Sequence, residues 1–282
     1  MTSTNAIRVR GLRKTYGGNV AVQHLDLDVA TGEIVALLGP NGAGKTTTTE
    51  ILEGFRDRDA GEVSVLGADP ATASDAWRAR IGVVLQEAKD LGELTVREIV
   101  EHFALYYPTP RDPAEVIGSV GLTGKKNARI KSLSGGQRRR LDVALGILGR
   151  PELLFLDEPT TGFDPEVRRQ FWDLVAGLRA EGTTILLTTH YLEEAEHLAD
   201  RVAVINHGTL LDVDTPARLG GRQVAPTLVR WTDVDGPHEL HTPLPGKAVS
   251  DLVTRFGGEV PDLTVTRPSL EDVYLQMIGA NR

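Results

Sequence analysis

A glycine-rich loop followed by lysine and threonine constrains this chain more than any other feature. Residues 39–46 read Gly-Pro-Asn-Gly-Ala-Gly-Lys-Thr and fit the phosphate-binding pattern G-x-x-x-x-G-K-[ST]. The loop follows a continuous apolar run, Ile34–Leu38, and a stretch that can start a helix begins at Lys45. This order directs backbone N–H groups and the positive end of a helix toward phosphate oxygens. A chance glycine-rich turn is the alternative, and the strand and helix on either side argue against it.

Other apolar runs predict an α/β fold with a mixed sheet. Ile7–Val9 and Leu25–Val29 alternate apolar and polar residues, as half-buried antiparallel strands do. Continuous runs are typical of strands covered on both faces, and they occur at Ile81–Leu85, Leu153–Leu156, Ile185–Leu187 and Val202–Ile205. Helical stretches lie between these runs, so we expect a parallel core joined to an antiparallel part.

The chain divides into a main domain and a smaller extension. Between about 87 and 149 the strand signal fades, and Thr95 with Glu98 forms a capping-box pattern, so a helical insertion is predicted there. We predict a domain over residues 1–214 and a small α+β extension over 215–282, where prolines interrupt short runs. The extension ends in an amphipathic helix with Ser269 as N-cap and Asp272 completing the box, which we expect to pack on the chain's own core.

Composition and charge exclude several classes of function. The chain has 282 residues and no cysteine, which rules out disulfides, thiolate nucleophiles and cysteine-ligated metals. With 39 acidic and 31 basic residues the net charge is −8, which disfavours a general nucleic-acid binder. The run Arg138–Arg140 does not change this, because on a helix its side chains point in different directions and are expected on a solvated face.

The sequence also indicates whether the chain spans a membrane. The apolar runs fall far short of the ~20 residues that span a bilayer, and the polar N-terminus has no apolar signal core. We therefore expect a soluble, cytoplasmic protein. If it serves a membrane process, another chain must span the bilayer.

Several side chains have the chemistry for a nucleotide site. The Lys45 ammonium can reach the outer phosphates of a nucleotide, and the Thr46 hydroxyl can ligate Mg²⁺. Asp157 ends an apolar strand and is suited to hold Mg²⁺, while Glu158 can polarise the water that attacks the γ-phosphate. The alternative for these two acids is that they cap the strand end, which is weak beside a phosphate loop.

Two further elements lie between and beyond these residues. Leu133–Gln137 forms a polar turn before the helical stretch Arg138–Leu148, where Ser134 and glycine N–H groups offer a second anion site. His190 follows the strand Thr184–Thr189, from which its imidazole could reach the γ-phosphate. A lone histidine is more often a solvated one, so this residue carries little weight by itself.

Taken together, these motifs resemble the nucleotide-binding subunit of ATP-binding cassette (ABC) transporters, over roughly Ile7 to Asp214. The Walker A loop, signature, Walker B strand and D-loop correspond to 39–46, 133–137, 153–157 and 162–165. The D-loop departs from the family at Phe163, where leucine is usual, which bears on dimer packing. The resemblance implies ATP and Mg²⁺ as cofactors. By it, the catalytic residues are Glu158, His190 and Gln86, and the metal ligands are Thr46, Gln86 and Asp157. The nucleotide-binding residues are Tyr16 (stacking on adenine), Gly39, Pro40, Asn41, Gly42, Ala43, Gly44, Lys45, Thr46, Thr47, Ser134, Gly135, Gly136, Gln137 and Asp164.

A subfamily is also indicated. The segments Glu53–Arg56, Ser134–Ala144, Thr189–Ala195 and Pro268–Leu275 look like the daunorubicin-resistance type of export ATPase. This resemblance implies an ATPase that powers a separate polytopic membrane permease, exporting a drug, antibiotic or lipid-like substrate. The same resemblance implies a homodimer with ATP at shared sites, on the cytoplasmic face of the membrane, without nucleic acid.

Two alternatives remain beside export. A soluble ABC ATPase of translation or DNA repair is disfavoured, because the chain has one Walker A and one signature, no long coiled coil between them and no cysteine cluster. An importer ATPase is disfavoured only weakly, by the C-terminal extension. The transported substrate is handled by the membrane chain and is not encoded here.

Overall fold

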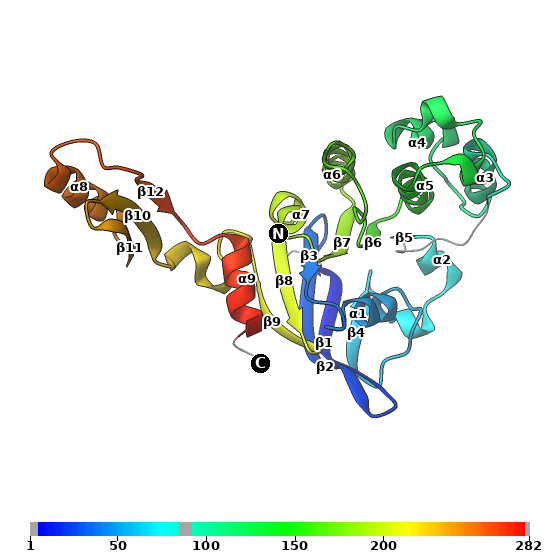
Figure 1. Cartoon of the computed structure of the whole chain (residues 1–282). Coiled ribbons are helices and arrows are strands. Elements are labelled where there is room, and N and C mark those ends of the chain that lie inside the picture. The colour runs from blue at the N-terminus through cyan, green and yellow to red at the C-terminus, as the bar shows by residue number, and fades with distance from the viewer. Residues whose placement is uncertain (1–4, 85–91, 280–282) are drawn as a thin grey trace. The chain divides into compact units, whose positions relative to one another are not determined.

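The computed structural model describes residues 5–84 and 92–279 and divides into two units (Figure 1). The first is Met1–Val213 and the second Asp214–Arg282. The first unit holds a nine-stranded sheet in the order β4-β1-β2-β9-β8-β3-β7-β6-β5. The second holds a three-stranded sheet in the order β11-β10-β12.

An antiparallel part forms one side of the large sheet. β1 (Asn5–Tyr16) pairs with β2 (Asn19–Ala30) and with β4 (Ala60–Val65). Gly17 and Gly18 join β1 to β2 with φ values of +53° and +88°, the left-handed backbone that a tight two-residue hairpin favours. Both strands extend well beyond the short alternating runs predicted from sequence.

The parallel part confirms the continuous apolar runs. β3 (Ile34–Leu38) is buried at every residue and lies between β7 (Thr184–Thr189) and β8 (Arg201–Asn206). β6 (Leu153–Asp157) pairs with β7 on one side and with β5 (Ile81–Val84) on the other. β9 (Thr209–Asp214) pairs in parallel with β2. The α/β fold with a mixed sheet is thereby confirmed.

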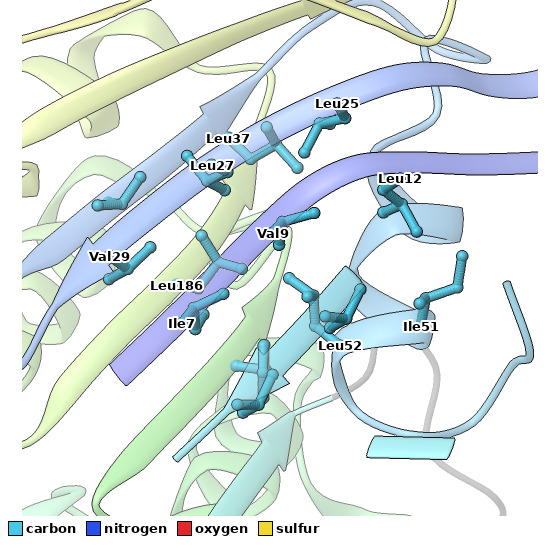
Figure 2. Packing of buried hydrophobic residues seen from close by; sticks show 14 of the residues in the cluster. Ile7, Val9, Leu12, Leu25, Leu27, Val29, Leu37, Ile51, Leu52 and Leu186 are labelled. Atoms are coloured by element: carbon cyan, nitrogen blue, oxygen red, sulfur yellow. The ribbon is translucent and has the colours of Figure 1, made fainter. Parts of the chain in front are cut away.

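The main core lies between the sheet and helix α1 (Lys45–Leu52). Figure 2 shows the side chains that converge there from β1, β2, β3, β7 and α1: Ile7, Val9, Leu12, Leu25, Leu27, Val29, Leu37, Ile51, Leu52 and Leu186. Each is at most 2% exposed. Because α1 follows the glycine loop directly, this packing anchors the loop to the sheet.

Helices fill the segment between β5 and β6. They are α3 (Val96–Ala104), α4 (Pro113–Ser119) and α5 (Gly135–Ile147), with short 3₁₀ turns at Thr123–Lys125 and Ile130–Ser132. The Thr95–Glu98 capping box that begins α3 is confirmed. The predicted start of the insertion near residue 87 falls outside the described residues. Helix α5 begins three residues earlier than predicted, because Ser134 caps it.

The remaining elements of the first unit complete the layers around the sheet. They are the 3₁₀ turn Pro70–Thr72, α2 (Asp75–Arg78), α6 (Pro165–Ala180) and α7 (Leu192–Leu198). Helix α6 follows β6 and buries Phe171, Trp172 and Val175, and α7 follows β7.

The second unit is a small α+β structure with its own core. Its elements are η4 (Leu219–Val224), β10 (Thr227–Asp233), β11 (Gly236–Thr242), α8 (Pro245–Phe256), β12 (Thr264–Thr266) and α9 (Leu270–Gly279). Helix α8 packs on β10 around Val229, Leu252 and Val260. The predicted Ser269–Asp272 box at the start of α9 is confirmed, and α9 packs on η4 within this unit.

Candidate nucleotide site

Three neighbouring parallel strands end at the same edge of the large sheet. β3 and β7 run side by side with Leu38 opposite Thr189, and β7 pairs in parallel with β6. The glycine loop leaves β3, while β7 and β6 lead directly into His190 and Glu158. Ligands in α/β sheets bind outside the carboxyl ends of strands. The sheet therefore brings together three predicted site elements that lie far apart in the sequence.

The glycine loop depends on the missing side chain at Gly44. This residue has a φ of +104°, and a Cβ there would lie 2.5 Å from the carbonyl oxygen of Ala21. Gly44 is also the N-cap of α1, and within the described residues no side chain caps this helix. The first N–H groups of α1 are thus left for an anion, as in phosphate-binding helix N-termini.

Lys45 lies folded into the loop that precedes it. Its Nζ donates hydrogen bonds to the carbonyl oxygens of Gly39 and Pro40 at 2.7 and 3.2 Å, and the side chain is buried. Burial lowers the pKa of Lys45, while Glu158 and Asp157 oppose that shift. Backbone carbonyls are weak partners for a buried ammonium, so a phosphate offers Lys45 a stronger one.

Two carboxylates lie at the end of β6, Asp157 as its last residue and Glu158 directly after it, and Thr188 of β7 bonds to both residues. The Thr188 hydroxyl donates to Asp157 Oδ1, and the Glu158 N–H donates to the carbonyl and hydroxyl oxygens of Thr188, each at 3.1 Å. Glu158 has a φ of +44°, a left-handed conformation that costs a non-glycine residue about 1–3 kcal/mol. Strain of this kind persists only where the surroundings enforce it, and it often marks a functional residue.

His190 and Glu158 form a pair between the ends of two adjacent strands. His190 Nδ1 lies 3.2 Å from Glu158 Oε2. The Tyr191 ring packs on the His190 ring with centroids 4.1 Å apart, and the Arg168 guanidinium lies 4.9 Å from the Tyr191 ring centroid. Glu158 is 13% exposed and His190 39%, so both are accessible to a small ligand.

The signature turn forms the start of helix α5 rather than a separate turn. The Ser134 Oγ accepts the Gln137 N–H at 3.3 Å, and the Gln137 side chain accepts the Ser134 N–H at 3.1 Å. This box borders a cavity of about 360 Å³. The lining residues are Ser134, Gly135, Gly136, Gln137, Arg140, Gly162, Phe163, Asp164 and Val167.

The D-loop residues shape the other wall of that cavity. Asp164 caps α6 by accepting the Val167 N–H at 2.9 Å. Phe163, the departure from the family pattern, is buried with its ring against Phe171 at a centroid distance of 5.9 Å. The larger ring is therefore accommodated inside the chain, and Asp164 keeps its capping role.

Tyr16 lies at the end of β1 with cationic groups near its ring. Its side chain is partly exposed, Lys14 Nζ lies 5.4 Å from the ring centroid, and the Arg56 guanidinium lies 5.5 Å from it. A ring that already attracts cations presents the electron-rich face on which a purine base can stack.

The metal ligands are described in part. Gln86 lies outside the described residues. Thr46 and Asp157 supply the hydroxyl and carboxylate oxygens that Mg²⁺ takes in nucleotide sites, where phosphates and water complete its coordination. Among the residues described, no three His, Cys, Asp or Glu side chains gather into a metal cluster. Such a donor set fits an ion held jointly with a nucleotide.

Sequence reasoning missed three buried charged residues around the site. The expectation of a solvated face for Arg138–Arg140 is wrong for Arg139, which is 8% exposed. Its spacing to the buried Val143 and Ile147 on α5 was the available signal. Glu53 and Glu194 are also buried.

These two carboxylates have raised pKa values because of burial. Burial raises the pKa of Glu53 to about 7, with Asp157 and Glu50 adding to the shift. Within the described residues Glu53 Oε2 has no hydrogen-bond partner. Burial also raises the pKa of Glu194, against the opposing effect of the Thr189 and Thr160 hydroxyls.

Comparison with known proteins assigns the family. Residues 22–161 match the ABC transporter family. The daunorubicin/doxorubicin resistance ATP-binding protein DrrA of Streptomyces peucetius is 45% identical over 77% of this chain and 67% of its own length. The Nod factor export ATP-binding protein I of Rhizobium sp. (strain N33) is 38% identical, covering 97% of each chain.

Solved structures share the fold. An ATP-binding subunit of an ABC transporter superposes with a TM-score of 0.73 at 22% identity, over 97% of this chain and 99% of that one. A dimeric ATP-binding cassette with bound ADP and phosphate gives a TM-score of 0.68 at 24% identity, over 74% of this chain and 98% of that one.

No helix in the described part of the chain is long and apolar enough to cross a bilayer. The site joins a glycine loop, a Walker B carboxylate and a glutamate–histidine pair at one sheet edge. On these grounds the chain belongs to the ATP-binding subunits of ABC transporters, which bind and hydrolyse ATP, and it is similar to the daunorubicin-resistance type.

Proposed function

We propose that this chain powers an exporter, as a homodimer attached to a separate polytopic membrane permease on the cytoplasmic face of the cell membrane. The observation that carries the proposal is the Glu158–His190 pair, 3.2 Å apart, at the ends of β6 and β7. β7 is the neighbour of β3, which leads into the glycine loop. A base, its partner and a phosphate cradle are the parts that hydrolysis of a γ-phosphate requires.

ATP binding is assigned to the loop and to Tyr16. Backbone N–H groups within residues 41–47 and the Lys45 ammonium hold the outer phosphates, and Lys45 exchanges its two carbonyl contacts for phosphate oxygens. Tyr16 stacks on the adenine ring. Because α1 is anchored in the core through Ile51 and Leu52, the loop is preorganised for this contact.

Mg²⁺ is assigned to the Thr46 hydroxyl and the Asp157 carboxylate, with Gln86 as a further ligand. Thr188 donates to one oxygen of Asp157, which orients that carboxylate for a cation. When bound with ATP, the ion neutralises charge on the γ-phosphate.

Hydrolysis is assigned to Glu158 and His190. Glu158 accepts the proton of the attacking water, and its strained backbone directs the carboxylate from the strand end toward the site. His190 orients the carboxylate through Nδ1, and its other ring nitrogen is assigned to the γ-phosphate. The ring packing of Tyr191 on His190 fixes the imidazole plane.

The signature residues are assigned to the nucleotide of a second copy. Ser134, Gly135, Gly136, Gln137 and Asp164 border one cavity of their own. In the ABC fold a signature turn lies far from its own phosphate loop, so a head-to-tail dimer with two shared sites uses both halves.

Export of a drug, antibiotic or lipid-like substrate is supported by the names of the relatives, which include daunorubicin resistance and Nod factor export proteins. Co-purification of the tagged chain with a polytopic membrane protein tests the partner. Inside-out vesicles carrying both chains test the direction, with daunorubicin as the probe cargo. We expect ATP-dependent daunorubicin accumulation that Lys45→Ala abolishes. A chain that purifies with ribosomes or DNA, or vesicles that release preloaded cargo instead, would contradict the proposal.

A further inference from the structure

One buried cation joins the signature helix to the catalytic turn of the same chain. Arg139 lies on α5, five residues after the cap Ser134. Its Nε donates to the carbonyl oxygen of Pro159 at 3.1 Å, and its Nη2 donates to the carbonyl oxygen of Asp157. These two carbonyls lie on either side of Glu158 in the chain.

Four carboxylates lie close enough to this guanidinium to favour its charge. Burial lowers the pKa of Arg139, and the negative charges of Asp142, Asp157, Glu194 and Glu158 oppose the shift. An arginine keeps its charge in such surroundings. The negative charge of these acids therefore favours the cation, and its Nε and Nη2 donate to backbone carbonyl oxygens.

The contacts enclose Glu158 from two sides. On the β7 side, the Glu158 N–H donates to both oxygens of Thr188. On the α5 side, Arg139 holds the carbonyls before and after Glu158. Glu158 has the left-handed φ of +44°, which a chain retains only where neighbouring contacts enforce it.

We propose that Arg139 is a positioning residue for hydrolysis, which holds Glu158 in its strained conformation and fixes it to the signature helix. The planar guanidinium suits this task because it donates in two fixed directions at once, whereas an ammonium acts as a point charge. The inference rests on the proposed role of Glu158 as the base. It implies that a shift of α5 at Ser134 also shifts the chain's own catalytic carboxylate.

Kinetics of Arg139→Met and Arg139→Lys test this role, with Arg138→Met as the matched control. Arg138 has the same charge on the same helix, but it donates to the Ile130 carbonyl oxygen, away from the turn. We expect Arg139→Met to lower kcat by about 10²-fold, the cost of displacing a catalytic group by about 1 Å, with ATP affinity unchanged. Arg139→Lys should lower kcat less, and Arg138→Met should leave it near the wild-type value.

A second comparison separates positioning from general stability. In a Glu158→Gln background the base is already removed, so Arg139→Lys should change the residual turnover by less than twofold. Thermal melting identifies a variant that fails to fold. If Arg139→Met fails to fold, the kcat of Arg139→Lys alone tests the positioning role.

Different outcomes would overturn the positioning role of Arg139 and the catalytic role of Glu158. Wild-type kcat in folded Arg139→Lys and Arg139→Met, or an equal further loss in the Glu158→Gln background, would overturn the positioning role. Unchanged turnover in Glu158→Gln itself would instead overturn the proposed function of Glu158.

Discussion

Two helices of this chain begin at glycine-containing turns, and their N-termini are built differently. Helix α1 starts at Gly44, whose left-handed backbone provides no side-chain cap, and Lys45 follows at once. Helix α5 starts at Ser134, whose hydroxyl and N–H are both used in a box with Gln137. The first terminus has no side-chain cap and carries a cation, whereas at the second the N–H groups of Ser134 and Gln137 are already bonded to each other's side chains.

The difference indicates two kinds of phosphate contact. The terminus of α1 gains hydrogen bonds when a phosphate arrives, so it can bind a nucleotide by itself. At the terminus of α5 the capping box already uses two of the N–H groups, so we propose that it adds to a nucleotide that is already held elsewhere. We therefore propose that α1 binds the nucleotide and that α5 of the partner copy completes the site.

The largest effect is expected at the first terminus. Lys45→Ala should abolish ATP binding and hydrolysis together, because it removes the buried ammonium from the loop. Titration with a fluorescent ATP analogue measures the affinity, and circular dichroism verifies folding. Near-native affinity in a folded Lys45→Ala chain would show that the loop backbone suffices, and our assignment of Lys45 would be wrong.

The next effect concerns turnover without binding. Glu158→Gln should retain ATP affinity but lower turnover by roughly 10²–10⁴-fold, the usual span for a positioned base. It should also trap an ATP-bound dimer, detectable by size-exclusion chromatography. Glu152→Gln, at the other end of β6 and paired with Arg80 on the surface, is the control and should behave as wild type. Normal turnover in Glu158→Gln would move the catalytic role elsewhere, with His190 as the next candidate.

A smaller effect is expected at the second terminus. Ser134→Ala removes the cap of α5 and should destabilise the chain by about 1 kcal/mol. The ATP affinity of the isolated chain should not change, whereas turnover of the dimer should fall several-fold. Chemical denaturation and ATPase assays measure both quantities. A loss of ATP affinity in the monomer would erase the distinction between the two helix termini.

The last prediction concerns the stability of the fold rather than turnover, and it involves Glu53, at the C-terminal end of α1. The pKa of Glu53 is raised from 4.5 to about 7 in the folded chain, so protonation favours folding. Its stability contribution is present in full below pH 4.5 and is lost as the pH rises through about 7. Glu53→Gln should therefore flatten the fall in unfolding free energy between pH 5 and 8, a difference of up to about 3 kcal/mol. An equally steep fall in Glu53→Gln would place the titration elsewhere.

The features that the sequence predicts correctly are formed by residues close together in the chain. The loop at 39–46 and the Ser269–Asp272 box depend on neighbours a few residues away, so their sequence patterns predict them. β1 and β2 are longer than the predicted runs, because their backbone pairing continues as far as Tyr16 opposite Asn19 at the hairpin.

Long-range contacts account for what sequence could not provide. The sequence singles out Glu158 and His190 because each follows an apolar strand, and only the pairing of β6 with β7 brings them together. Helical spacing indicates the burial of Arg139, but its hydrogen bonds to the carbonyl oxygens of Asp157 and Pro159 depend on another strand, which no local pattern encodes. Gln86 lies outside the described residues, and its role stays a prediction.

Activity of mixed dimers tests most directly whether the two helix termini serve different nucleotides. Lys45→Ala chains and Ser134→Arg chains, carrying different affinity tags, are combined, and mixed dimers are isolated by tandem purification. One site of such a dimer then carries both substitutions, while the other joins an intact loop to an intact signature. We predict that mixed dimers bind ATP at that second site and hydrolyse it at a rate well above that of either parent homodimer. Mixed dimers as inactive as both parents, with no ATP retained, would contradict the head-to-tail account.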